Sequence, residues 1–224
     1  VTPTPFLRAI REAAPNTFLT VGSGINDPEL ASEEGAIAHG FQALADGADA
    51  VYTGLSCERI RAMSREKIPC IGHVGYVPYR SSWYGGARAI GKKADEAIQV
   101  YRDTLAYQEA GAIAVEMEIV PHRIATEIAK RVDILIISMG SGVGGDVQYL
   151  FAEDVLGTNT GHVPRHAKVY ADLHGELQRV QQIRIDAFAA LQQEVASGAY
   201  PESKHLIGVD DQEFDAFLSG IDAS

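Results

Sequence analysis

Two glutamates in an apolar stretch are the first residues whose type and spacing suggest chemistry. Glu116 and Glu118 lie within residues 113–119, which are otherwise mostly apolar and predict a β-strand. Alternate residues of a strand point to the same side, so we expect both carboxyl groups to face one way. Burial would raise the pKa of such a carboxyl group, as a general base near neutral pH requires. The residues alone leave open whether Glu118 is such a base or is simply paired with an arginine.

Glu116 needs a positive neighbour if both side chains point into the protein. An unpaired charge in a protein interior is costly, so we expect an arginine, another cation or a metal ion beside this carboxylate. His73 lies in another apolar run, residues 70–74. On the sequence alone, a histidine at a strand end is more often a core residue with satisfied ring nitrogens than a ligand.

Two glycine-rich segments could bind anions. Residues 22–24 are followed by Ile25, Asn26 and Asp27, which breaks the G-x-G-x-x-G pattern of dinucleotide-binding folds. Residues 140–145 are closer to it, but they follow a late strand and lack the acidic partner about 20 residues on. In (β/α)8 barrels, glycine-rich loops after late strands commonly hold phosphate or other anionic groups. Asp27 either caps a turn or helix beside Pro28 or is a metal ligand.

Composition restricts the class of protein. The 224 residues are 46% hydrophobic and 22% charged, as in ordinary globular proteins. The net charge of −11 disfavours nucleic acid and anionic membranes as partners. We find no apolar stretch long enough to span a bilayer and no signal peptide. The two cysteines, Cys57 and Cys70, predict reduced thiols and a cytoplasmic location.

Short apolar runs alternate with helical patterns along the chain. The predicted strands are residues 17–21, 50–53, 70–74, 113–119 and 134–139, with a sixth near 148–151. The predicted helices are residues 33–46, 93–110 and 121–131, of which the first two end at Gly47 and Gly111. A longer amphipathic helix over 170–196 is expected to pack on an outer ring.

This alternation predicts parallel strands joined by right-handed crossovers. Because the dinucleotide fingerprint is missing, a (β/α)8 TIM-type barrel fits better than an open doubly wound sheet. We predict one barrel domain over residues 1–209, and an acidic tail over 210–224 that is a docking helix or a frayed end. Eight strands are expected in a barrel of this kind. The sequence shows only five or six, so we expect a homo-oligomer that covers the incomplete edge of the sheet.

Several motifs occur in the order and spacing of one enzyme family. They are Cys70–Pro78, Tyr84–Gly86, Gly91, Asp95–Ala97, Glu109–Ala112, Glu118–Pro121, Met139–Gly142, Gly161–Lys168, Ser197–Glu202 and His205. Across residues 68–205 the sequence resembles ketopantoate hydroxymethyltransferase (3-methyl-2-oxobutanoate hydroxymethyltransferase), of the phosphoenolpyruvate mutase and isocitrate lyase superfamily. The resemblance implies a (β/α)8 barrel and a role in pantothenate biosynthesis.

The resemblance also implies a reaction and roles for particular residues. In the family, Mg2+ chelates a small 2-oxo acid, a carboxylate removes the adjacent proton, and the enolate attacks the one-carbon unit of methylenetetrahydrofolate. Glu118 matches the catalytic carboxylate, and His73 matches the histidine that faces the substrate. The resemblance also places Gly22, Ser23 and Tyr52 at positions of the substrate site, although Tyr52 stands where the family has a lysine.

The first third of the chain departs from the family pattern. In one alignment the metal-binding acids fall on Gly22 and Gly54, whose side chains cannot bind a metal. A second alignment sets residues 21–24 against an earlier motif of the family, and it keeps the serine at Ser23 but loses the aspartate. In both alignments the first one or two strands are unmatched. The metal ligands are therefore unknown, with Glu116 and Asp27 as candidate replacements. Three hypotheses stay open: the hydroxymethyltransferase or a related lyase or aldolase with an altered metal site, a non-catalytic paralogue that serves in binding or assembly, and an unrelated binding barrel.

Overall fold

The computed structural model describes residues 4–24 and 27–222, so Ile25 and Asn26, which bear on the glycine pattern above, lie outside the described residues. The chain forms two compact units. One holds the residues up to Val155 together with His162–Lys168, and the other holds 156–161 and 169 onward. The predicted boundary at residue 209 stays a prediction.

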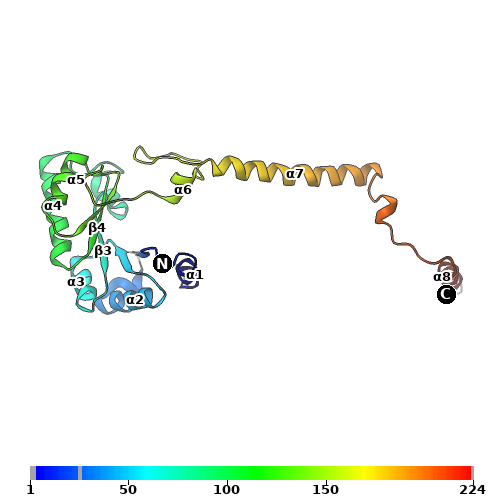
Figure 1. The fold of residues 1–224 in the computed structure, drawn as a ribbon, viewed down its shortest axis with the longest axis horizontal. Coiled ribbons are helices and arrows are strands. Elements are labelled where there is room, and N and C mark those ends of the chain that lie inside the picture. Colours follow the sequence, from blue (N-terminus) through cyan, green and yellow to red (C-terminus); the bar gives the residue numbers. More distant parts are fainter. Residues whose placement is uncertain (1–3, 25–26, 223–224) are drawn as a thin grey trace. The chain divides into compact units, whose positions relative to one another are not determined.

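The first unit is built on six parallel strands, which confirms the α/β class (Figure 1). The strands are β1 (Thr20–Ser23), β2 (Ala50–Thr53), β3 (Cys70–Gly75), β4 (Ala114–Glu118), β5 (Leu135–Met139) and β6 (Val147–Gln148). Each strand pairs with the next one in the chain, in the order β1-β2-β3-β4-β5-β6. This order lacks the reversal of a doubly wound sheet. The sheet of the described residues stops at six strands, with β1 and β6 at its edges, so a closed ring of eight is not formed.

Helices between the strands bury one face of this sheet. The helices of the unit are α1 (Thr4–Ala13), α2 (Glu33–Ala45), α3 (Cys57–Arg65), α4 (Ala94–Glu109), α5 (His122–Ala129) and α6 (Ala152–Leu156), with 3-10 turns η1 (Pro28–Ala31) and η2 (Pro78–Tyr84). Helix α2 packs on β2, α3 packs on β3, and α4 packs on β3 and β4. Figure 1 shows α4 and α5 along one side of β3 and β4. Val51, Val74, Val115, Met117 and Ile136 belong to this main core.

The opposite face of the sheet, here called the inner face, carries a smaller apolar cluster. Ala50, Ile71 and Ala114 are buried there, with Tyr52 and Ile137 packed against them. A cavity of about 280 Å³ opens beside these residues. The inner face is therefore partly apolar and partly open to a small ligand.

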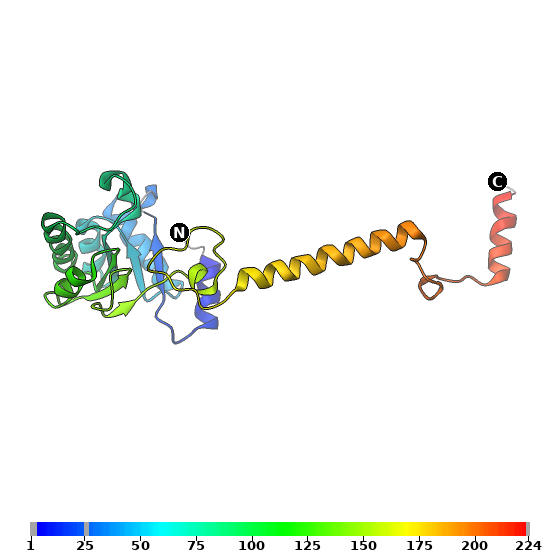
Figure 2. The ribbon, with the colours of Figure 1, turned by 90° about the horizontal axis from the view of Figure 1, so that it is seen from above.

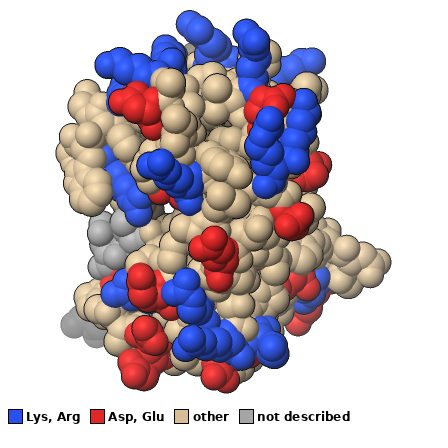
Figure 3. All heavy atoms as spheres, turned by 90° about the vertical axis from the view of Figure 1, so that its left-hand side faces the viewer, with Lys and Arg blue, Asp and Glu red and all other residues tan. Residues whose placement is uncertain are grey.

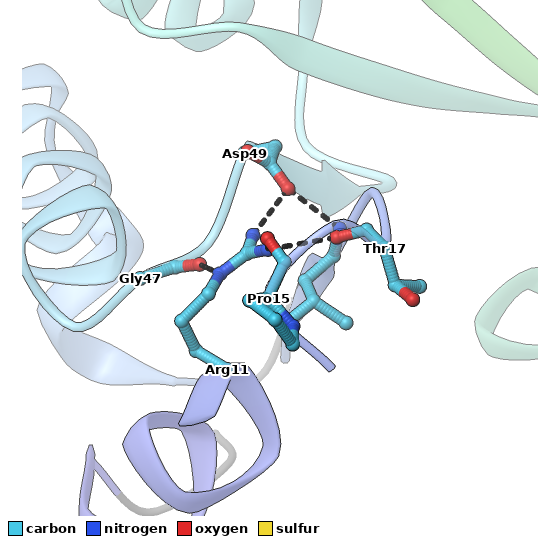
Figure 4. A network of polar contacts seen from close by, with 6 residues as sticks. Arg11, Pro15, Thr17, Gly47 and Asp49 are labelled. Atoms are coloured by element: carbon cyan, nitrogen blue, oxygen red, sulfur yellow. Dashed lines mark hydrogen bonds and ion pairs between the residues drawn. The ribbon is translucent and has the colours of Figure 1, made fainter. Parts of the chain in front are cut away.

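Arg11 of α1 ties the start of the sheet together (Figure 4). Its guanidinium group donates to the backbone carbonyls of Gly47, Pro15 and Thr17 at 2.8, 3.0 and 2.8 Å. The same group pairs with Asp49, whose carboxylate also accepts the N–H of Leu19 at 2.7 Å. These side-chain bonds occupy the backbone before Thr20, which is why β1 begins at Thr20 and not at residue 17 as predicted.

The second unit is dominated by α7 (Leu173–Ser197), with η3 (Ser203–His205) and α8 (Asp211–Asp222) following it. Helix α7 is one unbroken helix (Figure 2), close to the predicted 170–196. It begins at Asp172, which caps Gly175, and ends at the left-handed Gly198. None of its side chains is buried, so its predicted packing on an outer ring stays a prediction.

No helix within residues 4–24 and 27–222 has both the length and the apolar character that crossing a membrane requires. The cytoplasmic location predicted from the cysteines stays a prediction.

Candidate active site

The two glutamates of β4 lie side by side with His73 of β3 on the inner face. Strand β4 alternates between faces: Val115 and Met117 enter the main core, while Glu116 and Glu118 point the other way, as the spacing predicted. The register of β3 against β4 sets His73 opposite Glu116 and Gly75 opposite Glu118. All three polar side chains are buried, with exposed fractions of 5% for His73, 4% for Glu116 and 7% for Glu118.

Tyr52 completes a group of four that we call the His–Glu cluster. His73 Nε2 lies 3.0 Å from Glu118 Oε2 and 4.0 Å from Glu116 Oε1. On the other side of the ring, Nδ1 lies 2.7 Å from the Tyr52 hydroxyl. A chain of hydrogen bonds thus runs from Tyr52 through the imidazole to Glu118.

The cluster perturbs two of its own groups. Burial raises the pKa of Glu116, and Glu118 raises it further, while His73 and the Tyr52 hydroxyl oppose the rise. Burial, with Glu116 and Glu118 nearby, also raises the pKa of Tyr52 far above its ordinary value. Tyr52 is therefore a neutral phenol with a single proton. That proton can be donated to His73 or to Glu116, but not to both at once.

The end of β4 is fixed by Ser141 of the glycine-rich loop that follows β5. The fully buried Ser141 hydroxyl accepts the Val120 N–H at 2.9 Å and donates to the Met117 carbonyl at 2.8 Å. Ile119 has a positive φ of 50°, a conformation that is strained for a β-branched residue. Ser141 was not among the residues predicted to position the site. Its place in a glycine loop after an apolar strand is the signal that could have found it.

The remaining predicted residues divide into two groups. Gly22 pairs with Tyr52 across β1 and β2, so it lies on the inner face near the cluster. Ser23 points to the other face, where its hydroxyl lies 2.8 Å from His39 Nε2 of α2. Asp27 caps η1 by accepting the Glu29 N–H at 3.0 Å. The structure therefore brings His73, Tyr52, Glu116, Glu118 and Gly22 together, and it leaves Ser23 and Asp27 apart from them.

Three members of the cluster could hold a divalent cation. One donor atom from each of His73, Glu116 and Glu118 lies within 4.8 Å of the other two. One nitrogen with two carboxylates suits Zn2+, Fe2+ or Mn2+, whereas Mg2+ prefers oxygen donors and several waters. The positions expected to bind Mg2+ are glycines, Gly22 and Gly54, and supply no side-chain ligand atom.

Tyr52 and Glu116 also line the 280 Å³ cavity of the inner face, together with Ile71, Ile137 and Tyr149. A small molecule in this cavity would meet an apolar wall on one side and a carboxyl group on the other. The fold and the cluster thus define a parallel α/β protein with a buried histidine–carboxylate pair at the carboxyl ends of its strands, an arrangement suited to proton transfer.

Comparison with known proteins identifies the family. Residues 5–203 match the family described as ketopantoate hydroxymethyltransferase. The chain is 34% identical over 206 residues to 3-methyl-2-oxobutanoate hydroxymethyltransferase of Nitratidesulfovibrio vulgaris, and the match covers 92% of this chain and 63% of that protein. The enzyme of the same name from Acetivibrio thermocellus is 36% identical over 199 residues, covering 87% and 65%. This chain belongs to the ketopantoate hydroxymethyltransferase family, and it spans somewhat less than two thirds of the length of these two relatives.

Solved structures give more distant likenesses. The carboxyl transferase domain of Rhizobium etli pyruvate carboxylase has a TM-score of 0.45 at 17% identity, covering 61% of this chain and 25% of that one. Phosphonopyruvate hydrolase has a TM-score of 0.41 at 15% identity, covering 100% and 79%.

Proposed function

We propose that this protein is a hydroxymethyltransferase that forms a C–C bond next to the oxo group of a small 2-oxo acid through an enolate. The observation that carries the proposal is the buried hydrogen bond between His73 Nε2 and Glu118 Oε2 at the end of β4. The names of the relatives supply the substrate, 3-methyl-2-oxobutanoate. Methylenetetrahydrofolate as the one-carbon donor is part of the same proposal and rests on the family resemblance.

We further propose that the six strands are part of a TIM-type barrel that lacks one or two strands at its start. The sequential strand order supports this, because strands added before β1 would continue the same winding. Active sites of such barrels lie at the carboxyl ends of the strands, which is where Glu118 ends β4.

In the proposed reaction, Glu118 removes a proton from C3 of the 2-oxo acid. One arrangement of the hydrogen bonds suits this role. The neutral phenol of Tyr52 donates a hydrogen bond to His73 Nδ1. The imidazole then carries its own proton on Nε2 and donates it to Glu118, which is the carboxylate. Glu118 therefore enters the reaction oriented by His73 and ready to accept a proton.

No step of the proposed reaction passes through Mg2+. The positions that the family uses for this ion lack side-chain ligand atoms here, and the alternative donor set would take both His73 and Glu118 as ligands. A cation held by that set would occupy the carboxylate that must accept the proton. We therefore expect added Zn2+ to slow proton abstraction and a chelator to restore it.

The test is deuterium exchange at C3 of 3-methyl-2-oxobutanoate in D2O, followed by proton NMR with EDTA present. Exchange needs no folate and isolates proton abstraction from C–C bond formation. Glu118→Gln should lower the exchange rate by about 10²- to 10⁴-fold while preserving the melting temperature. The matched control is Glu109→Gln, the same change at an exposed site at the end of α4, which should leave the rate unchanged.

Two outcomes would contradict the proposal. Equal exchange in the wild type and Glu118→Gln, both clearly above buffer, would remove Glu118 from the reaction. No exchange above buffer in the wild type, with several 2-oxo acids and with added metals, would favour the non-catalytic paralogue.

A further inference from the structure

A second pocket lies beyond the carboxyl ends of β4 and β5. It has a volume of about 530 Å³. Ile119 and Val120 line it where the chain leaves β4, and Gly140 and Gly142 line it where the chain leaves β5. The mechanism proposed above uses none of the side chains discussed below.

Basic side chains from three segments converge on this pocket. Lys92 precedes α4, His122 begins α5, and Arg165 and His166 come from the loop that follows α6. Among the residues that the structure describes, neither Lys92 nor Arg165 forms an ion pair, and no acidic residue lines the pocket. Figure 3 shows Lys and Arg side chains at the top and in the lower half of the face that carries α4 and α5, with acidic side chains among them. The whole chain has a net charge of −11, so basic side chains without acidic partners make this pocket locally positive.

The start of α5 adds uncapped backbone donors. Helix α5 begins after Pro121 with no side-chain cap and no acidic residue in its first turn. The first N–H groups of such a helix have no partner within the helix, and the helix dipole favours an anion beside them. His122, the first residue of α5, is one of the residues that line the pocket.

His166 presents a polar atom that lacks a partner. Its Nε2 is buried and makes no hydrogen bond within the described residues. A buried nitrogen without a partner is costly unless a ligand or water satisfies it.

The glycines of the loop allow the two histidines to approach its backbone. Gly140 has a φ of 66°, and a Cβ there would come within 2.9 Å of the His166 ring. Gly142 has a φ of 85°, and a Cβ there would come within 2.4 Å of the His122 Cβ. Side chains at these positions would push both imidazoles away, so the loop composition and the histidine positions depend on each other.

We propose that this pocket binds the anionic group of a small molecule, either a phosphate or a carboxylate. Three features of one cavity support this proposal. Lys92 and Arg165 line it without ion pairs, α5 begins there without a side-chain cap, and His166 Nε2 has no hydrogen-bond partner. The proposal does not depend on the reaction proposed above, because binding can be measured without turnover.

The experiment is a calorimetric titration of the whole chain with inorganic phosphate and, separately, with succinate at constant ionic strength. We expect saturable one-site binding of at least one of them, and the better ligand identifies the anion class. Arg165→Gln and Lys92→Gln should each weaken binding by about tenfold or more, because each removes a charge-assisted hydrogen bond. The matched control is Lys93→Gln, which removes the same charge one residue away from the pocket lining and should change affinity less than about twofold.

Two results would overturn the proposal. One is the absence of saturable binding of both anions up to about 10 mM, which corresponds to a free energy near −3 kcal/mol. The other is equal weakening by Lys93→Gln, which would indicate a diffuse field and no site. If a variant fails to fold, proton NMR of the wild-type histidine rings decides. The signals of His122 and His166 should move with anion concentration, and unmoved signals would place any binding elsewhere.

Discussion

Glu116 and Glu118 share a strand face but have different hydrogen-bond partners. His73 lies 3.0 Å from Glu118 and 4.0 Å from Glu116. If the single proton of Tyr52 is donated to His73, Glu116 loses its donor and faces a neighbouring carboxylate. Its raised pKa then favours the neutral acid. In the proposed reaction, the neutral acid Glu116 then lies beside the base Glu118.

The raised pKa of Glu116 has a consequence for stability. An acid whose pKa is higher in the folded than in the unfolded state binds more protons when folded, so stability falls as the pH rises from the unfolded towards the folded pKa. Glu116→Gln removes this group. With EDTA present, we expect the variant to match the wild type near pH 4 and to melt about 2–4 °C higher above the folded pKa, the shift that 1 kcal/mol produces in a chain of this size. Thermal melts between pH 4 and 8 measure the difference.

The control for this prediction is Glu109→Gln, which should show no such pH-dependent gain. A Glu116→Gln variant that is less stable than the wild type at every pH would mean that the carboxylate is stabilised in the folded state by a cation. That result would favour the metal interpretation of the cluster over the neutral acid.

Part of this site could be predicted from the sequence. Alternation along residues 113–119 places Glu116 and Glu118 on one face whatever the tertiary fold. The contact between His73 and both glutamates depends on the register of β3 against β4, which a single sequence does not reveal. Ser23 illustrates the same limit, because its position follows from where β1 begins. Arg11 and Asp49 set that point from elsewhere in the chain.

Among the connecting elements, the loop after β5 is held to β4 through Ser141. Ser141→Ala would leave the Val120 N–H and the Met117 carbonyl without their partner in a buried setting, at a cost of about 1–3 kcal/mol. We expect the melting temperature to fall by roughly 2–12 °C. C3 exchange should also slow, because Glu118 lies between the two released groups. Ser197→Ala, an exposed serine at the end of α7, is the control and should change neither value.

The junction of α1 with β1 and β2 should depend on pH through Asp49. The Leu19 N–H and the Arg11 guanidinium group lower the pKa of this carboxyl group. A lowered pKa contributes stability above the unfolded value of about 3.9 and is lost as the pH falls through the folded value. The melting temperature of Asp49→Asn should therefore lie below that of the wild type at pH 7 and approach it as the pH falls below that unfolded value. A constant difference across this range would show that the asparagine side chain destabilises the junction for reasons other than charge.

The elements differ in how well the sequence predicted them. Residues 50–53 match β2, and the helices that end near Gly47 and Gly111 match α2 and α4 within about one residue. These segments carry strong signals, an apolar run or a left-handed glycine with φ of 102° and 90°. Helices α1, α3 and α6 were missed. They are ten, nine and five residues long, whereas the eight-residue α5 was predicted because Pro121 marks its start.

At the scale of the whole molecule, the unpaired edges of the sheet are a liability. Within the described residues, β1 and β6 each have one neighbour, and β6 has only two residues, both exposed. Exposed strand edges invite pairing with another chain unless something covers them. The second unit carries an exposed apolar surface that would also be stabilised by contact with another chain. Leu177, Val180, Phe188, Leu191 and Val195 are spaced along one stripe of α7 and are between 37% and 73% exposed.

We expect this stripe to be buried against a second copy of the chain, so the protein should be a homo-oligomer. Light scattering at micromolar concentration should give at least twice the chain mass of 24.1 kDa. Phe188→Glu places a charge in the stripe and should shift the population to monomer, because burying an unpaired carboxylate is costly. Gln193→Glu makes a carboxylate on the opposite side of α7 and should leave the mass unchanged. A wild type that is monodisperse at 24.1 kDa would mean that the stripe covers the chain's own surface, and Phe188→Glu should then lower the melting temperature without changing the mass.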